Sequence, residues 1–199
     1  QGIVKDFYSS ADSPTASFNS PPYLYKTLMD MVKADPVLFT AVNLTVDLVT
    51  YKGYSFIGKN ERAIKEAYDL FENKLDFDQV IDNLTWQMLV YGDAFLEIRW
   101  NQDKTEVMEL HPLDTAEMRI KYDEHGDIKG FVQEVEGKSE FDWPVFSTDE
   151  IIHFRMHWIG SQVYSHAPFQ AIARPYATQI YANDYLTSIF RNLPPKIIY

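Results

Sequence analysis

Two carboxylates lie four residues apart in the stretch VYGDAFLEIRW, at Asp93 and Glu97. Paired carboxylates could perform glycosidase-type acid–base chemistry, which needs two carboxyl groups that converge at roughly 5 to 9 Å across a cleft. The stretch instead predicts a helix end, a stop at Gly92 and an alternating strand, in which four residues span about 13 Å. We therefore predict that Asp93 is a turn residue at the helix stop and that Glu97 lies on the outer face of a sheet, both without catalytic duty.

A second pair, His153 and His157 in HFRMH, has the spacing that binds zinc on a helix. Neighbouring apolar residues alternate with these histidines, however, so the segment is predicted to be a strand in which the two imidazoles lie about 13 Å apart. One metal ion cannot join them. We expect His153, Arg155 and His157 to form a polar sheet face.

The sequence contains no cysteine and no G-x-x-x-x-G-K-[ST], G-x-G-x-x-G or G-x-S-x-G motif. Thiolate zinc sites, cysteine nucleophiles and the common nucleotide and serine-hydrolase sites therefore lose their support. We assign no catalytic, cofactor-binding or metal-ligating residue and predict that the protein is not an enzyme. One enzymatic alternative stays open, a carboxylate-dependent hydrolase that uses Asp93, Glu97, Glu109 or Asp114.

The formal net charge of the 199 residues is −11, and no stretch gathers enough Lys and Arg to neutralise a row of phosphates. Tight binding of nucleic acid is therefore disfavoured. No run approaches the roughly 18 apolar residues that span a bilayer, so no membrane partner is expected.

The elements that would position these side chains follow from the hydrophobic period. We expect helices over 21–35, with Asp35 and Pro36 opening the next one, and over 37–49, 61–74 and 77–91, and a short strand over 53–58. From residue 94 the period changes to two, which predicts strands over 94–100, 107–113, 117–123, 128–135 and 150–158 in meander order. Helices followed by a mainly antiparallel small sheet indicate the α+β class.

The last element is a helix over 167–191, about 37 Å long, with only three charged residues. Ser165 or His166 could cap it, and Pro175 should kink or split it. A long helix so poor in charge needs neighbours on more than one side, either its own sheet or copies of itself.

The order of motifs resembles that of the portal proteins of tailed bacteriophages and prophages. The resemblance rests on F-x-x-P-P-Y (Phe18 to Tyr23), DPVLFTAVNLTVDLV, GYSF, LVYGDAFLEI, ELHPLDTAEMRI, DIKGFVQ, STDEIIHFR and SHAPFQAIARPYATQIYANDYLTSIFRNLPPKIIY. WIGSQVYSHAPF departs from the family's more usual YG-x-S.

The resemblance implies a structural protein of the virion, found at one vertex of the capsid and assembled in the cytoplasm of the host bacterium. Its subunits would form a homo-oligomeric ring, normally a dodecamer, that serves as a DNA conduit in viral genome packaging and ejection. The implied partners are further copies of the chain, the terminase packaging motor, capsid and scaffold proteins, a tail adaptor and passing double-stranded DNA; no cofactor is implied. Another virion connector subunit is the alternative within this class.

On this sequence the resemblance implies an irregular arm over 1–20, a wing-like domain over 21–164, a stem-like helix over 165–192 and the start of a clip over 193–199. Family members are commonly more than twice as long, so the resemblance implies an N-terminal fragment. The residues expected to pack between subunits on the stem-like helix are Ile172, Tyr176, Ile180, Tyr185, Leu186 and Ile189.

Overall fold

The computed structural model describes residues 25–122, 125, 127–157, 159–160 and 163–192. The arm predicted over 1–20 and the clip-like start over 193–199 lie outside the described residues. The division of the chain into the four predicted regions stays a prediction.

Among the described residues, four α-helices precede the strands: α2 (Tyr25–Ala34), α3 (Pro36–Thr50), α4 (Glu61–Tyr68) and α5 (Phe77–Tyr91). The start of α3 confirms the sequence analysis, because the Asp35 carboxylate accepts hydrogen bonds from the backbone N–H groups of Val37 and Leu38 at 2.8 and 3.2 Å and Pro36 supplies the fixed φ of a first helical residue. The end of α5 is also as predicted, since Gly92 follows it with a φ of 83°.

Two predictions about the helical part are wrong. Residues 53–58 form no strand, because no neighbouring strand pairs with this segment. Its aromatic side chains pack in the helical part instead: the rings of Tyr54 and Phe56 lie 6.3 and 5.1 Å from that of Phe71. The helix expected over 61–74 is α-helical only to Tyr68 and continues as a π-helical segment, Asp69–Lys74.

The strands form two antiparallel sheets of three. The first has the order β2-β1-β6 and the second β3-β4-β5. Their bounds are β1 Asp93–Trp100, β2 Val107–Leu113, β3 Met118–Tyr122, β4 Ile128–Gln133, β5 Val145–Phe146 and β6 Ile151–Arg155. The α+β class is confirmed. The predicted meander order is wrong at two places: β2 and β3 belong to different sheets, and β6 pairs with the free edge of β1 instead of following β5.

Strand β1 is the centre of the fold because both of its faces are covered. Phe95 packs in a core shared with Met118, Ile120 and Phe131 of the second sheet. On the opposite face, Ala94 and Leu96 pack in a core with two residues of α5, Val80 and Leu84. A strand covered on two faces buries successive residues, so the outer face expected from the alternation of β1 is absent at its start.

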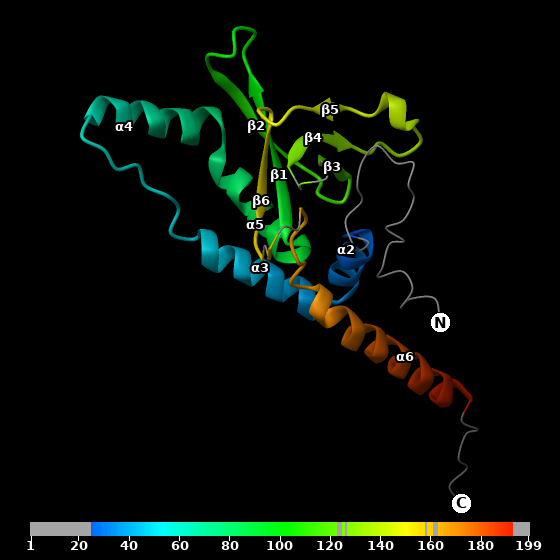
Figure 1. Ribbon diagram of the computed structural model, residues 1–199. Coiled ribbons are helices and arrows are strands. Elements are labelled where there is room, and N and C mark those ends of the chain that lie inside the picture. The colour runs from blue at the N-terminus through cyan, green and yellow to red at the C-terminus, as the bar shows by residue number, and fades with distance from the viewer. Residues whose placement is uncertain (1–24, 123–124, 126, 158, 161–162, 193–199) are drawn as a thin grey trace, which may run out of the picture.

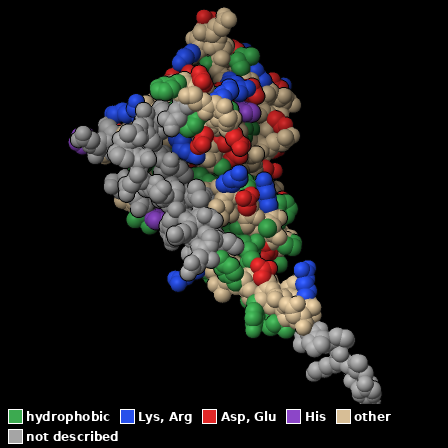
Figure 2. All heavy atoms as spheres, turned by 90° about the vertical axis from the view of Figure 1, so that its right-hand side faces the viewer, with side chains coloured by type: hydrophobic (Ala, Val, Ile, Leu, Met, Phe, Trp, Pro, Cys, Tyr) green, Lys and Arg blue, Asp and Glu red, His purple; other side chains and the backbone are tan. Residues whose placement is uncertain are grey.

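Helix α6 (Gln170–Asn192) begins three residues later than predicted and contains Pro175 without being split. Ala173 and Ala177 pack with α2 and α3, whereas the distal half projects away from the sheets and the other helices (Figure 1). Figure 2 shows apolar side chains on this projecting end, while acidic and basic ones crowd the body. None of the described helices is long and apolar enough to cross a bilayer.

Candidate functional site: the joint that carries helix α6

The carboxylate of Asp93 binds the lead-in of α6, by which we mean residues 163–169, to the helices and sheets that precede it, which we call the body. It accepts hydrogen bonds from the Tyr25 hydroxyl at 2.7 Å and from the Ser165 backbone N–H at 3.0 Å, and it lies 2.9 Å from His153 Nε2. Asp93 has no exposed surface. We call Tyr25, Gly92, Asp93, His153 and Ser165 the joint. Asp93 does follow the helix stop, but the prediction of a plain turn residue is wrong, because its side chain joins four segments of the chain.

Gly92 allows the lead-in to approach. A Cβ atom at this position would lie 2.6 Å from the carbonyl oxygen of His166, and the positive φ independently favours glycine. The Gly92 carbonyl oxygen accepts a hydrogen bond from the Met156 N–H at 2.8 Å. The predicted cap by Ser165 or His166 is wrong, because α6 begins only at Gln170 and both residues lie too far before it. The Ser165 N–H binds Asp93 instead.

His153 is part of the core, so its assignment to a polar face is wrong. Its side chain is 5% exposed, and its ring stacks on Phe95 with a centroid distance of 4.5 Å. The register that pairs His153 with Phe95 turns both rings toward the second sheet. His157 is exposed and lies beyond the end of β6, so the two histidines do not share a site.

Two buried tyrosines flank the joint. The Tyr91 ring packs 4.9 Å from that of Tyr25, and among the described residues its buried hydroxyl has no hydrogen-bond partner. The Tyr164 hydroxyl accepts a hydrogen bond from the Ile120 N–H at 2.9 Å. Burial raises the pKa of both hydroxyls well above the ordinary tyrosine value, because an apolar surrounding disfavours the phenolate.

The remaining carboxylates of the hydrolase alternative lie elsewhere. Glu97 on β1 and Glu109 on β2 both pair with Arg99, at 3.1 and 2.9 Å, and their hydrogen bonds raise the pKa of Arg99. Asp114 is exposed in the turn after β2 and accepts a hydrogen bond from the Ala116 N–H. A general acid or base must reach its substrate, and these groups do not meet Asp93, which is sealed from solvent.

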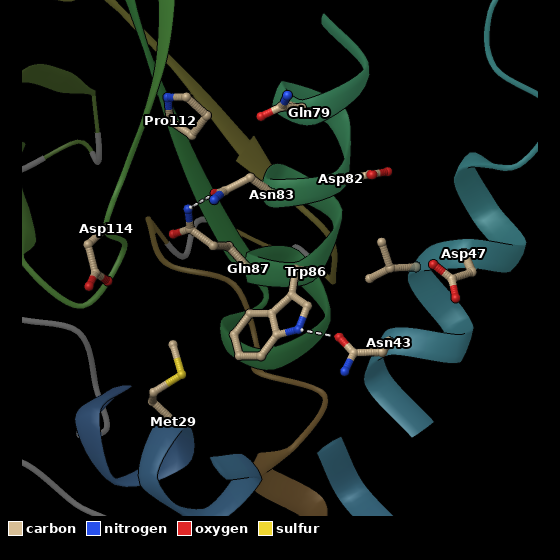
Figure 3. A pocket seen from close by; sticks show the side chains of 11 residues that line it. Met29, Asn43, Asp47, Gln79, Asp82, Asn83, Trp86, Gln87, Pro112 and Asp114 are labelled. Atoms are coloured by element: carbon tan, nitrogen blue, oxygen red, sulfur yellow. Dashed lines mark hydrogen bonds between the residues drawn. The ribbon is translucent and has the colours of Figure 1, made fainter. Parts of the chain in front are cut away.

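A pocket of about 640 Å³ opens between α2, α3, α5 and the end of β2 (Figure 3). Its amide side chains bind within the fold: Trp86 Nε1 donates to Asn43 Oδ1 at 3.2 Å, and Gln87 Nε2 donates to Asn83 Oδ1 at 2.6 Å. Gln87 Oε1 also accepts from the Thr115 N–H. These bonds hold α5 to α3 and to the turn before β3, so the polar groups that line the pocket stabilise the fold.

The six residues proposed for packing between subunits differ in exposure. Tyr176 packs on the core of its own chain, whereas Tyr185 is 68% exposed. Ile172, Leu186 and Ile189 are also exposed, and Ile180 is half-buried. Phe190, which the sequence analysis did not single out, is 73% exposed.

The sequence did not predict the bonds of the Tyr25 hydroxyl and the Ser165 N–H to Asp93, because no local pattern marks a group that will meet a carboxylate far along the chain. The signal available was Asp93 itself, a carboxylate placed between two apolar runs.

The joint is a structural feature: its carboxylate is buried and bound to groups of its own chain, and the helix that follows it exposes apolar side chains. The family model for phage portal proteins matches residues 40–197. The chain belongs to the phage portal protein family, a family of structural proteins. No curated protein sequence matches the chain.

The fold is shared with solved structures of gene transfer agent particles. A chain in the neck of an empty particle, computed with C6 symmetry, has a TM-score of 0.71 and 22% identity and covers 97% of this chain. A chain of the native virion has a TM-score of 0.68 and 21% identity, and one of the native neck, computed with C12 symmetry, 0.60 and 19%; both cover 97% of this chain. The chain spans only 51 to 52% of these neighbours, and at such identities the likeness establishes the fold.

Proposed function

We propose that this chain is the wing and first stem helix of a portal subunit that forms a homo-oligomeric ring, normally of twelve copies, at one vertex of a virion. The ring would be a conduit for double-stranded DNA in packaging and ejection. It would dock the terminase motor, capsid and scaffold proteins and a tail adaptor, after assembly in the cytoplasm of the host bacterium. We propose no catalytic activity for it.

The observation that carries this proposal is the distal half of α6. Large apolar side chains stand exposed there, including Tyr181, Tyr185, Leu186 and Phe190. They surround a polar stripe of residues at helical spacing, Asp184, Thr187, Ser188 and Arg191. Packing α6 side by side around an axis would bury the apolar part, while the polar stripe could face water.

Charge and neighbouring structures add support. A conduit should not grip its cargo, and a chain of net charge −11 repels phosphate. The neck structures that share the fold were computed with C6 and C12 symmetry, which is the kind of arrangement that the proposal requires.

The first test is electron microscopy of the complete protein, purified without other viral proteins. Rings with a central hole are expected, and a compact monomer would contradict the proposal. Particle classes would count the subunits.

A matched pair of variants tests the role of α6. Leu186→Lys in the complete protein should remove the rings, because lysine replaces an apolar contact with a charge that must be desolvated. Thr187→Lys, one residue further and on the polar stripe, should leave them. Equal ring yields for both variants would refute side-by-side packing of α6.

The hydrolase alternative has its own test. Alanine at Glu97, Glu109 and Asp114, one at a time, should leave phage production unchanged in a complementation assay. Loss of infectious particles from a variant that still assembles normal rings would favour an enzymatic role.

A further inference from the structure

Helix α3 carries an apolar stripe on its outer face. Val37, Ala41, Leu44, Leu48 and Tyr51 follow one another at alternating steps of four and three residues, so they lie along one side of the helix. All five are exposed; Val37 is 75% and Leu48 64% exposed. We call these five residues the α3 stripe.

The opposite side of the same helix is used by the body. Val42 and Val46 are buried in the core that contains Ala173 and Ala177 of α6. A helix with apolar residues on two sides needs neighbours on both. The side chains of the α3 stripe keep their large exposed fractions with every described element in place, so none of the described elements is the second neighbour.

Charge decides what kind of neighbour fits. Two copies of a chain with net charge −11 repel each other, so contact between them is favoured over surface that is poor in charge. Asp47 is the only charged residue between Pro36 and Thr50. The alternating steps of the α3 stripe are those that pack against another helix.

The position of α3 near α6 and the small area of the α3 stripe also favour a second copy of the chain. Because α3 and α6 share one core, a molecule that packs along α6 is brought near α3. Five side chains are too few to supply the roughly 800 Å² per partner of a stable interface. The α3 stripe therefore fits an occupant that also binds α6.

We propose that the α3 stripe is the seat of a second copy of this chain, the next subunit around the ring. The inference rests on the proposed ring and adds a second contact, made by the body and separate from the stem-like helix. No residue of α3 was predicted from the sequence to lie in an interface.

The test places the photoreactive residue p-benzoylphenylalanine at Leu44 or Leu48 of the complete protein, in assembled rings. Irradiation should yield subunit-to-subunit cross-links, and the cross-linked peptide identifies the facing surface. The same probe at Ala63 on α4, which is exposed, is the control and should give few. Rings that give no such cross-links from Leu44 or Leu48, or only links to the probe's own subunit or to another viral protein, overturn the inference and leave the proposed ring standing.

A second measurement uses substitution. Leu44→Glu with Leu48→Glu should lower the fraction of subunits in rings by about tenfold or more, since buried carboxylates lack partners. Ala63→Glu should not. Thermal unfolding of the isolated subunit should match wild type, because both leucines are exposed there. Normal ring assembly by the double variant would overturn the inference, and failure of the unsubstituted protein to form rings would overturn the proposed function together with it.

Discussion

The hydroxyl of Tyr25 donates a hydrogen bond of 2.7 Å to the carboxylate of Asp93, joining the first described helix to a strand 68 residues later. The same carboxylate holds the backbone of Ser165. One buried side chain therefore holds the segment that leads into α6, in addition to the packing of Ala173 and Ala177 on α2 and α3.

Replacing Asp93 with alanine should destabilise the chain by about 3 kcal/mol or more, because it leaves a hydroxyl, a backbone N–H and an imidazole buried without their acceptor. Urea unfolding followed by circular dichroism measures the change. Glu97→Ala is the control and should cost about 1 kcal/mol or less, since its partner Arg99 is exposed and can turn to water. Equal losses for the two variants would mean that the joint carries no special share of the stability.

Two packed tyrosines allow a sharper comparison. Tyr25→Phe should cost about 1.5 to 3 kcal/mol, because it removes a hydrogen bond to a carboxylate. Tyr91→Phe should be neutral or stabilising by about 1 kcal/mol, because the described residues offer its buried hydroxyl no partner. Thermal unfolding of both variants provides the measurement, and a larger loss for Tyr91→Phe would reverse this assignment.

Gly92→Ala should be strongly destabilising, by about 3 kcal/mol or more, because the added methyl group would collide with the backbone carbonyl of His166. Gly137→Ala is the matched control: its φ of 82° is nearly the same, but nothing lies within 4 Å of the added atom, so only about 1 kcal/mol of backbone strain is expected. Chemical denaturation separates the two costs. If both variants lose the same amount, strain alone explains Gly92.

Alkaline pH should destabilise the fold. Burial raises the pKa of Tyr91 and Tyr164 above 10, the ordinary value. Above pH 10 the unfolded chain releases these protons while the folded chain keeps them, so the free energy of unfolding falls as pH rises, by about 1.4 kcal/mol per pH unit for each group.

Urea unfolding between pH 9 and 11.5 tests this. In Tyr91→Phe the free energy of unfolding should fall less steeply with pH than in wild type, by the contribution of one tyrosine, about 1.4 kcal/mol per pH unit. Identical slopes for wild type and variant would indicate that Tyr91 ionises equally in both states.

Much of the fold could be predicted from local patterns. The Asp35–Pro36 start of α3 and the Gly92 stop of α5 are set by backbone chemistry within a few residues. The strands at 94–100 and 107–113 follow from the period of their own side chains. The resemblance to portal proteins rested on the order of such motifs, and the family match confirms it.

Other features required the tertiary structure. The sequence of β6 does not say that it returns to β1, nor that His153 turns inward onto Phe95. Asp93 looks like an ordinary turn residue until Tyr25, His153 and Ser165 converge on it. The physical reason is that period, caps and glycine stops are properties of neighbouring residues, whereas burial and buried hydrogen bonds depend on which distant segments pack together.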